Sequence, residues 1–304
     1  MKSLPPLDVR PHVAAALQEG QPVVALTSAP LAHTLPWPIS LDAAREAEEA
    51  VRREGAVPAT IAVWRGRPTV GLSAEELEAL ARGQSAFRAS RRDLAAAMVH
   101  RQTAATTLSA NLCLAHRAGI RLLVTGGVGS LGRAVTENAL DVPDDLVALS
   151  RIPVAVVSAG AKGILALPRT VEILESFSVP VVGYGTDSLP AFYVRDTSHR
   201  VSARVNTPAE AAQLLAAHWG LDGAGVLLAQ PAPGDVALDP ALYGQSLLDV
   251  ERQAVSVHTK DLTPYLTSRL ARLTGGKTLE AYEAILAANA TLAARIAREL
   301  TAEG

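Results

Sequence analysis

The stretch Arg121-Leu-Leu-Val-Thr-Gly-Gly-Val-Gly-Ser-Leu-Gly132 decides the fold class of this chain. An apolar strand runs directly into a glycine-rich turn, as strands do where a parallel sheet meets its ligand. A second strand, Pro153–Val157, is followed by Ser158-Ala-Gly-Ala-Lys162. Such strands alternate with amphipathic helical segments, which implies crossover connections. The predicted class is therefore α/β, an α/β/α layered fold with a mostly parallel central sheet.

The individual elements follow from the spacing of the apolar residues. Apolar runs that would be covered on both faces predict strands: Val23–Leu26, Ala59–Trp64, Arg121–Val124, Pro153–Val157, Val179–Gly183 and Gly225–Ala229. Helical periodicity predicts helices: Leu41–Arg53, Ala74–Ala81, Thr106–Arg117, Pro208–His218, Leu238–Gln253, Leu262–Leu273 and Leu279–Leu300. We expect one domain over residues 1–304, with the helical segment 238–304 packed on it.

Local signals sharpen three of these boundaries. Ser73 with Glu76, and Thr207 with Glu210, have the spacing of capping boxes and mark two helix starts. The segment Arg65–Pro68, with Gly66 at its centre, predicts a tight hairpin inserted in the alternating pattern.

Composition limits the class of ligand. Apolar residues make up 49% of the 304 residues and charged ones 19%, as in a compact globular protein. A formal net charge of −2 provides no general attraction for nucleic acid or for an anionic membrane. Cys113 has no internal disulfide partner, and Met1–Arg10 lacks the pattern of a secretory signal. We expect a cytoplasmic protein that binds a small molecule, without nucleic-acid or membrane partners.

Lysine usage draws attention to one position. Only Lys2, Lys162, Lys260 and Lys277 are lysines among the 28 basic residues. Lys162 follows a predicted strand directly, where open α/β sheets place their ligands. We expect its amine to be partly desolvated and uncharged, and so able to form an imine with a sugar aldehyde, which arginine cannot do. The alternative is a solvated loop lysine.

The glycine-rich turn itself admits three interpretations. Glycines let backbone N–H groups approach a phosphate closely, which favours an anion site. Gly127, Gly129 and Gly132 also fit the dinucleotide pattern, but that pattern requires an acidic residue at the end of the next strand. The next strand ends in Ser158, which argues against nicotinamide binding. A purely structural turn is the remaining interpretation.

An acidic cluster lies between the turn and Lys162. Asp141, Asp144 and Asp145 could bind a divalent cation through their oxygens. Alternatively, Asp144 and Asp145 favour the N-terminus of a helix that begins there. The histidines show no metal-ligand spacing and the chain has one cysteine, which argues against zinc.

Motifs distributed over the chain resemble those of the pseudouridine-5'-phosphate glycosidases. The matching stretches keep their order from about residue 22 to 300 and include Glu54–Ala62, Ser90–Leu94, Ala105–Thr107, Gly119–Gly127, Pro153–Lys162, Val182–Asp187, Pro190–Tyr193, Leu273–Gly276 and Asn289–Ala294. The resemblance implies that family's α/β/α fold, a homotrimer, and a reversible reaction on ribose 5-phosphate assisted by Mn²⁺ or another divalent cation.

The same resemblance assigns roles by position. Lys162 corresponds to the imine-forming lysine, Asp141 to a metal ligand, and Asp145 and Asn289 to groups around the sugar. Further substrate contacts are implied for His33, Arg88, Thr107, Leu108, Gly126, Gly127, Pro143 and Asp144.

Several positions depart from the family pattern. Thr27 stands where the family has its general acid/base glutamate, and losing such a group typically costs about 10²- to 10⁴-fold in rate. Arg88 replaces a lysine, Gly132 a histidine and Pro143 a serine. The segment His33-Thr-Leu-Pro36 stands where the family has His-Gly-Met-Pro. The sequence therefore retains the features for phosphate binding and imine formation, but changes those that handle protons on uracil.

The predicted function is a C-glycosynthase that joins ribose 5-phosphate to a nucleophilic ring carbon of a heterocyclic or aromatic acceptor other than uracil. Relatives in C-nucleoside or C-ribosylated natural product biosynthesis are the model. One alternative is a pseudouridine-5'-phosphate glycosidase, and another is a non-catalytic sugar-phosphate-binding relative. A nicotinamide oxidoreductase is the weakest alternative.

Overall fold

The computed structural model describes residues 6–83, 86–129, 142–163, 166–253 and 259–302, and its centre is an 11-stranded sheet. The strand order is β1-β4-β3-β2-β7-β8-β11-β9-β10, with β6 paired to β3 and β5 to β6. The strands are β1 Asp8–Val9, β2 Val23–Thr27, β3 Val57–Trp64, β4 Arg67–Val70, β5 Phe87–Ala89, β6 Ala104–Thr106, β7 Leu122–Val124, β8 Ala155–Ser158, β9 Val181–Tyr184, β10 Ala203–Val205 and β11 Val226–Ala229. The strand pairs β3–β4 and β3–β6 are antiparallel and the other pairs are parallel.

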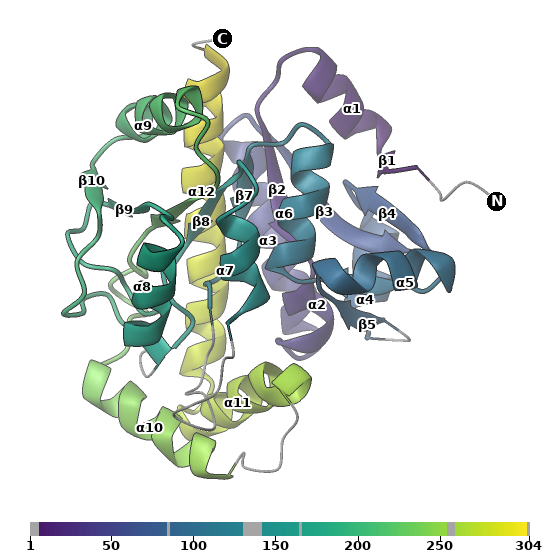
Figure 1. Ribbon diagram of the computed structural model, residues 1–304. Helices are drawn as coiled ribbons and strands as arrows, with labels where there is room; N and C mark the ends of the chain where they lie inside the picture. The colour runs from purple at the N-terminus through teal and green to yellow at the C-terminus, as the bar shows by residue number, and fades with distance from the viewer. Residues whose placement is uncertain (1–5, 84–85, 130–141, 164–165, 254–258, 303–304) are drawn as a thin grey trace.

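Helices cover both faces of this sheet, so the predicted α/β/α fold class is confirmed (Figure 1). They are α1 Pro11–Gln18, α2 Ala29–His33, α3 Ile39–Arg53, α4 Ala74–Ala81, the 3₁₀ turn η1 Arg91–Asp93, α5 Leu94–Val99, α6 Leu108–Arg117, α7 Asp144–Leu149, α8 Leu167–Ser176, α9 Pro208–Gly220, α10 Pro240–Gln253, α11 Thr259–Leu273 and α12 Lys277–Ala302. Every strand and helix expected from the sequence is present, with boundaries that shift by a few residues. None of the described helices is long and apolar enough to cross a membrane.

The longest helix, α12, fixes the centre of the fold. It runs along the sheet and packs against β2, β7 and β8, and its sides contact α3 and α9 (Figure 1). Small buried residues such as Ala290, Ala293 and Ala294 let the helix approach the strands closely. Apolar side chains of β2, β7, β8 and β11 are buried throughout, as expected for strands covered on both faces.

Two of the local sequence signals are confirmed and one is corrected. The hairpin β3–β4 turns at Arg65 and Gly66, both with positive φ. Ser73 and Glu76 form a full capping box. Thr207 accepts the Glu210 N–H as expected, but the Glu210 carboxylate accepts the N–H of Asn206 rather than that of Thr207. The second capping box is therefore only half formed, because the glutamate reaches one residue further back.

The sheet brings three carboxyl ends together. Strand β7 lies between β2 and β8, and all three are parallel, with Val124 opposite Leu26 on one side and Val157 on the other. The residues that follow, Thr27, Thr125 and Ser158, therefore meet at one edge, where ligands bind in open α/β sheets.

Candidate active site

Beyond the sheet, the segments after β7 and β8 stay paired. The Ala159 N–H donates to Gly126 O at 2.9 Å, Val128 N–H to Gly160 O at 2.9 Å, and Lys162 N–H to Val128 O at 2.8 Å. These bonds carry the parallel pairing up to Lys162. The main chain of the lysine is therefore fixed directly against the glycine-rich turn.

Gly160 makes this pairing possible. Its φ is +77°, and a Cβ at this position would lie 2.0 Å from the carbonyl oxygen of Pro190. Any side chain would displace the Pro190 loop, whose carbonyl also accepts the N–H of Ala161 at 3.0 Å. Glycine is thus required here both by the backbone conformation and by the close approach of a second loop.

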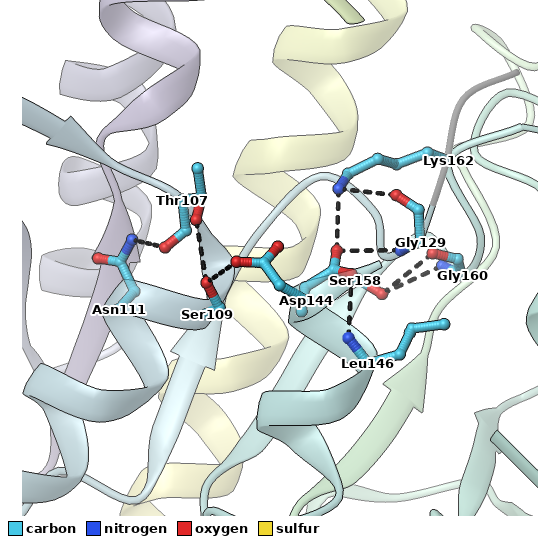
Figure 2. Close-up of polar contacts among 10 residues, drawn as sticks. Thr107, Ser109, Asn111, Gly129, Asp144, Leu146, Ser158, Gly160 and Lys162 are labelled. Atoms are coloured by element: carbon cyan, nitrogen blue, oxygen red, sulfur yellow. Dashed lines mark hydrogen bonds and ion pairs between the residues drawn. The ribbon is translucent and has the colours of Figure 1, made fainter. Parts of the chain in front are cut away.

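The Lys162 amine points into this edge of the sheet and not into bulk solvent. Its Nζ lies 3.0 Å from the carbonyl oxygen of Gly129 and 3.0 Å from Oδ2 of Asp145 (Figure 2). The side chain is 23% exposed and that of Asp145 only 6%. The amine that the sequence predicts to be partly desolvated is therefore also paired with a buried carboxylate.

Asp145 is the most heavily engaged acidic residue at this edge. Its carboxylate accepts the N–H of Gly129 at 3.0 Å and of Leu146 at 3.0 Å, in addition to the lysine amine. It lies in the first turn of α7, a position that favours a negative charge. One carboxylate thus joins the helix, the glycine-rich turn and the amine.

Asp144 points away from this pair toward α6. Its Oδ2 accepts the hydroxyl of Ser109 at 2.6 Å, and that hydroxyl lies 3.2 Å from the hydroxyl of Thr107 (Figure 2). Asp144 and Asp145 both sit in the first turn of α7, with Pro143 before them, as the helix interpretation of the acidic cluster expects.

The predicted metal site includes a residue that the structure does not describe. Asp141 and Gly132 lie outside the described residues, and the described part of the chain contains no group of three histidine, cysteine or acidic side chains placed to hold an ion. Both Asp144 and Asp145 already accept hydrogen bonds from protein donors. Binding of Mn²⁺ or another divalent cation therefore stays a prediction.

Thr107 and Leu108 form the start of α6. Thr107 is the N-cap residue, and its side chain makes no capping hydrogen bond. The first amides of a helix have no partner within the helix, so the α6 N-terminus can attract a negatively charged group. The substrate contacts expected of Thr107 and Leu108 are consistent with a negatively charged group bound at this helix start.

Gly126 and Gly127 are packed on one side. A Cβ on Gly126 would lie 2.9 Å from the Phe192 ring and 3.1 Å from the Tyr282 hydroxyl, and one on Gly127 would lie 2.7 Å from the Phe192 ring. The structural interpretation of the turn therefore accounts for Gly126 and Gly127 in part, because the Phe192 and Tyr282 rings leave no room for a side chain at these positions. Neither glycine N–H donates a hydrogen bond within the described chain, which leaves both available to an anion.

Asn289 and Thr27 flank the end of β7. The Asn289 amide, on α12, donates to the carbonyl oxygen of Thr125 at 3.1 Å, so its side chain lies at the carboxyl end of β7. Thr27 ends β2, and its buried hydroxyl has no hydrogen-bond partner among the described residues. A buried polar group without a partner is rare and marks a place where a ligand group can bond.

Arg88 and His33 lie on two elements, β5 and α2, that pack against each other. Arg88 lies on β5, and its charge acts on the Tyr282 hydroxyl, which places the two side chains near each other. His33 ends α2, which packs against β5 and β6.

The sequence interpretation missed Ser109, Phe192 and Tyr282. Ser109 lies in the predicted helix Thr106–Arg117 and Phe192 in the motif Pro190–Tyr193, but no local pattern indicates a role for either side chain. Tyr282 precedes Asn289 by two helical turns, and that spacing was the available signal.

Comparison with known proteins identifies the family. The family model for indigoidine synthase A like protein matches residues 12–299. The pseudouridine-5'-phosphate glycosidase of Hahella chejuensis is 44% identical over 298 residues, covering 96% of this chain and 97% of that protein. That of Deinococcus radiodurans is 44% identical over 298 residues, covering 96% and 94%.

Solved structures agree. The prealnumycin C-glycosynthase AlnA, in complex with ribulose 5-phosphate, has a TM-score of 0.88 at 35% identity, covering 98% of this chain and 97% of that one. An indigoidine synthase A-like protein from Thermotoga maritima has a TM-score of 0.88 at 29% identity, covering 99% and 98%. The chain therefore belongs to the family of the indigoidine synthase A-like proteins and pseudouridine-5'-phosphate glycosidases, and it is a glycosidase-like enzyme.

Proposed function

We propose that this enzyme makes and breaks a carbon–carbon glycosidic bond at C1 of ribose 5-phosphate, through an imine on Lys162. The observation that carries the proposal is the amine of Lys162, held 3.0 Å from the buried Asp145 carboxylate and beside the glycine-rich turn. The relatives named pseudouridine-5'-phosphate glycosidase and the glycosynthase solved with a pentulose phosphate support this substrate class.

The first half of the reaction uses the ion pair. Asp145 accepts a proton from Lys162, and the neutral amine adds to the aldehyde carbon of the open-chain sugar. Loss of one water molecule gives the imine, and reprotonation of its nitrogen makes C1 an electrophile. A carboxylate in contact with the amine is suited to both proton transfers.

The second half forms the new bond. A ring carbon of the acceptor attacks C1 and the imine nitrogen takes up the electron pair. The acceptor carbon then loses its proton, and the C4 hydroxyl closes the furanose ring on C1 as the lysine amine leaves. The net reaction joins ribose 5-phosphate and the acceptor with release of one water. The reverse sequence consumes water and releases both molecules.

We further propose synthesis as the main direction, with an acceptor carbon more nucleophilic than that of uracil. Thr27 supports this, because its hydroxyl can donate a hydrogen bond but does not titrate near neutral pH. Such an acceptor would be heterocyclic or aromatic. Homotrimer assembly, a divalent cation and a cytoplasmic location stay predictions that accompany this proposal.

Cleavage of pseudouridine 5'-phosphate is the second candidate. The relatives that carry this name are 41–44% identical to the chain, whereas the C-glycosynthase is 35% identical. In that case water or another side chain replaces the missing glutamate.

Trapping the imine tests the shared chemistry. Enzyme, ribose 5-phosphate and borohydride should give a reduced sugar adduct on the peptide that contains Lys162, detected by mass spectrometry. The variant Lys162→Arg keeps the charge but cannot form an imine, so it should stay unmodified. Wild-type protein that binds the sugar phosphate without an adduct would favour the non-catalytic relative.

Uracil as acceptor separates synthesis with another ring from the pseudouridine reaction. We expect wild-type enzyme with uracil and ribose 5-phosphate to form little pseudouridine 5'-phosphate, and Thr27→Glu to raise that rate by about 10²- to 10⁴-fold. Rapid formation by the wild type, with no gain in the variant, would establish the second candidate instead.

A further inference from the structure

Tyr282 on α12 brings a hydroxyl group to the glycine-rich turn. Its ring is buried against Phe192, with the ring centroids 5.2 Å apart, and the residue as a whole is 7% exposed. The hydroxyl lies 3.1 Å from the position that a Cβ on Gly126 would occupy. The polar end of this side chain therefore touches the loop that the sequence marks as an anion site.

The helix places Tyr282 and Asn289 on one face. Seven residues make almost two helical turns, about 10 Å along the axis. Asn289 bonds the carbonyl of Thr125, at the end of β7, while Tyr282 reaches Gly126, the next residue along the turn. One face of α12 thus contacts both the end of β7, through Asn289, and the glycine-rich turn, through Tyr282.

The groups around this hydroxyl are hydrogen-bond donors or cations. Arg88 is near enough for its positive charge to act on the hydroxyl. Burial raises the pKa of Tyr282, and the opposing effect of Arg88 does not cancel that rise, so the phenol stays protonated and can donate. The N–H groups of Gly126 and Gly127 donate no backbone hydrogen bond in the described part of the chain. Such a set of donors fits an anion.

Phe192, which packs against the Tyr282 ring, has a strained backbone. Phe192 has a φ of +58°, a conformation that costs an aromatic residue energy, and its N–H donates to Ala159 O at 2.9 Å. Its ring lies over Gly126 and Gly127 and against Tyr282. Strained residues persist where the surrounding structure fixes their conformation. Here Phe192 is fixed in this way, and its ring confines the Tyr282 ring on one side.

We propose that the Tyr282 hydroxyl binds the phosphate group of the sugar phosphate, donating a hydrogen bond beside Arg88 and the amides of Gly126 and Gly127. This inference rests on the proposed function for its substrate. It makes Tyr282 a substrate-binding residue, distinct from the Lys162 and Asp145 pair that carries the chemistry.

The variant Tyr282→Phe tests this with the loss of one oxygen atom. The half-saturating concentration of ribose 5-phosphate in borohydride trapping should rise about 10- to 100-fold, since a hydrogen bond to a charged group is lost. The maximal rate of trapping should stay near that of the wild type. Inorganic phosphate should compete with trapping in the wild type and correspondingly more weakly in the variant.

A matched control is Tyr265→Phe, which removes a hydroxyl that bonds the carbonyl of Gln253 on the neighbouring helix. It should leave the half-saturating concentration unchanged. A lower melting temperature of Tyr282→Phe with unchanged half-saturation would show a structural role and overturn the inference, while the proposed function would stand.

The two proposals fail separately. If wild-type enzyme gives no adduct, the imine chemistry is wrong, and calorimetric titration of wild type and Tyr282→Phe with ribose 5-phosphate still decides the phosphate contact. Weaker binding by the variant supports it. Equal affinities, or no binding by the wild type, refute it.

Discussion

Replacing Asp145 by asparagine is the sharpest test of the Lys162 ion pair. The substitution keeps the shape of the side chain and removes its charge. The carboxylate accepts bonds from Gly129, Leu146 and Lys162, all of them donors. Whichever way the new amide is oriented, its NH₂ group faces at least one of these donors, so a buried hydrogen bond is lost together with the charge.

The geometry sets the size of the effect. Breaking a fully buried pair costs about 3–5 kcal/mol, but the Lys162 side chain is 23% exposed and its amine can regain water. We therefore expect Asp145→Asn to lower the free energy of unfolding by about 2 kcal/mol, which is less than the cost of breaking a fully buried ion pair. For a chain of 304 residues that corresponds to a fall in Tm of roughly 3 °C. Trapping of ribose 5-phosphate should slow by about 10²- to 10⁴-fold, because the proton acceptor is gone.

Thermal unfolding followed by circular dichroism and the rate of borohydride trapping measure the two effects. Asp187→Asn is the control, since Asp187 pairs with Arg204 at 2.7 Å on the surface. It removes the same charge at a cost below about 1 kcal/mol and should not alter trapping. An Asp145→Asn variant that traps the sugar at the wild-type rate would refute the assigned proton transfer.

Two further substitutions probe the fold around the site. Gly160→Ala should lower the free energy of unfolding, measured in urea, by about 2–4 kcal/mol. Gly185→Ala is the control, because Gly185 also has a positive φ, +66°, but no atom lies within 4 Å of its added Cβ, so this substitution should cost only about 1 kcal/mol. Equal losses in the two variants would contradict the Pro190 contact. Burial, Asp42 and Glu280 raise the pKa of Glu283 above 4.5, so its charged form destabilises the fold as the pH rises through that raised value. Glu283→Gln should therefore raise Tm at pH 7 by an amount worth less than about 1 kcal/mol, and a gain that persists below pH 4.5 would disagree.

Much of the sheet could be predicted because burial on both faces leaves continuous apolar runs. Val23–Thr27 and Val226–Ala229 are examples in which every residue is buried. Strands such as β5 and β6 were missed because three residues carry no periodicity and their pairing is decided by distant partners. Helix α8 was also missed, although Pro168 near its start is a recognised signal.

Part of the candidate active site could likewise be predicted from the sequence, and part could not. Lys162 could be found because lysine is rare in this chain, and its place after a strand gave it a location. Its pairing with Asp145 could not, because that contact depends on where α7 packs beside the paired segments after β7 and β8. The side chain of Lys162 is 23% exposed, in line with the partial desolvation expected from the sequence, and the uncharged state of its amine stays a prediction.

The position of α12 has a consequence for biosynthesis of the enzyme. It covers β2, β7 and β8 and packs along α3, yet the ribosome makes it long after all of these. Until it emerges, a broad apolar surface of the nascent sheet lacks its cover and invites chaperones or aggregation. Assembly must therefore wait for late, long-range contacts, which slow folding, and the chain acquires Asn289 and Tyr282 only in that closing step.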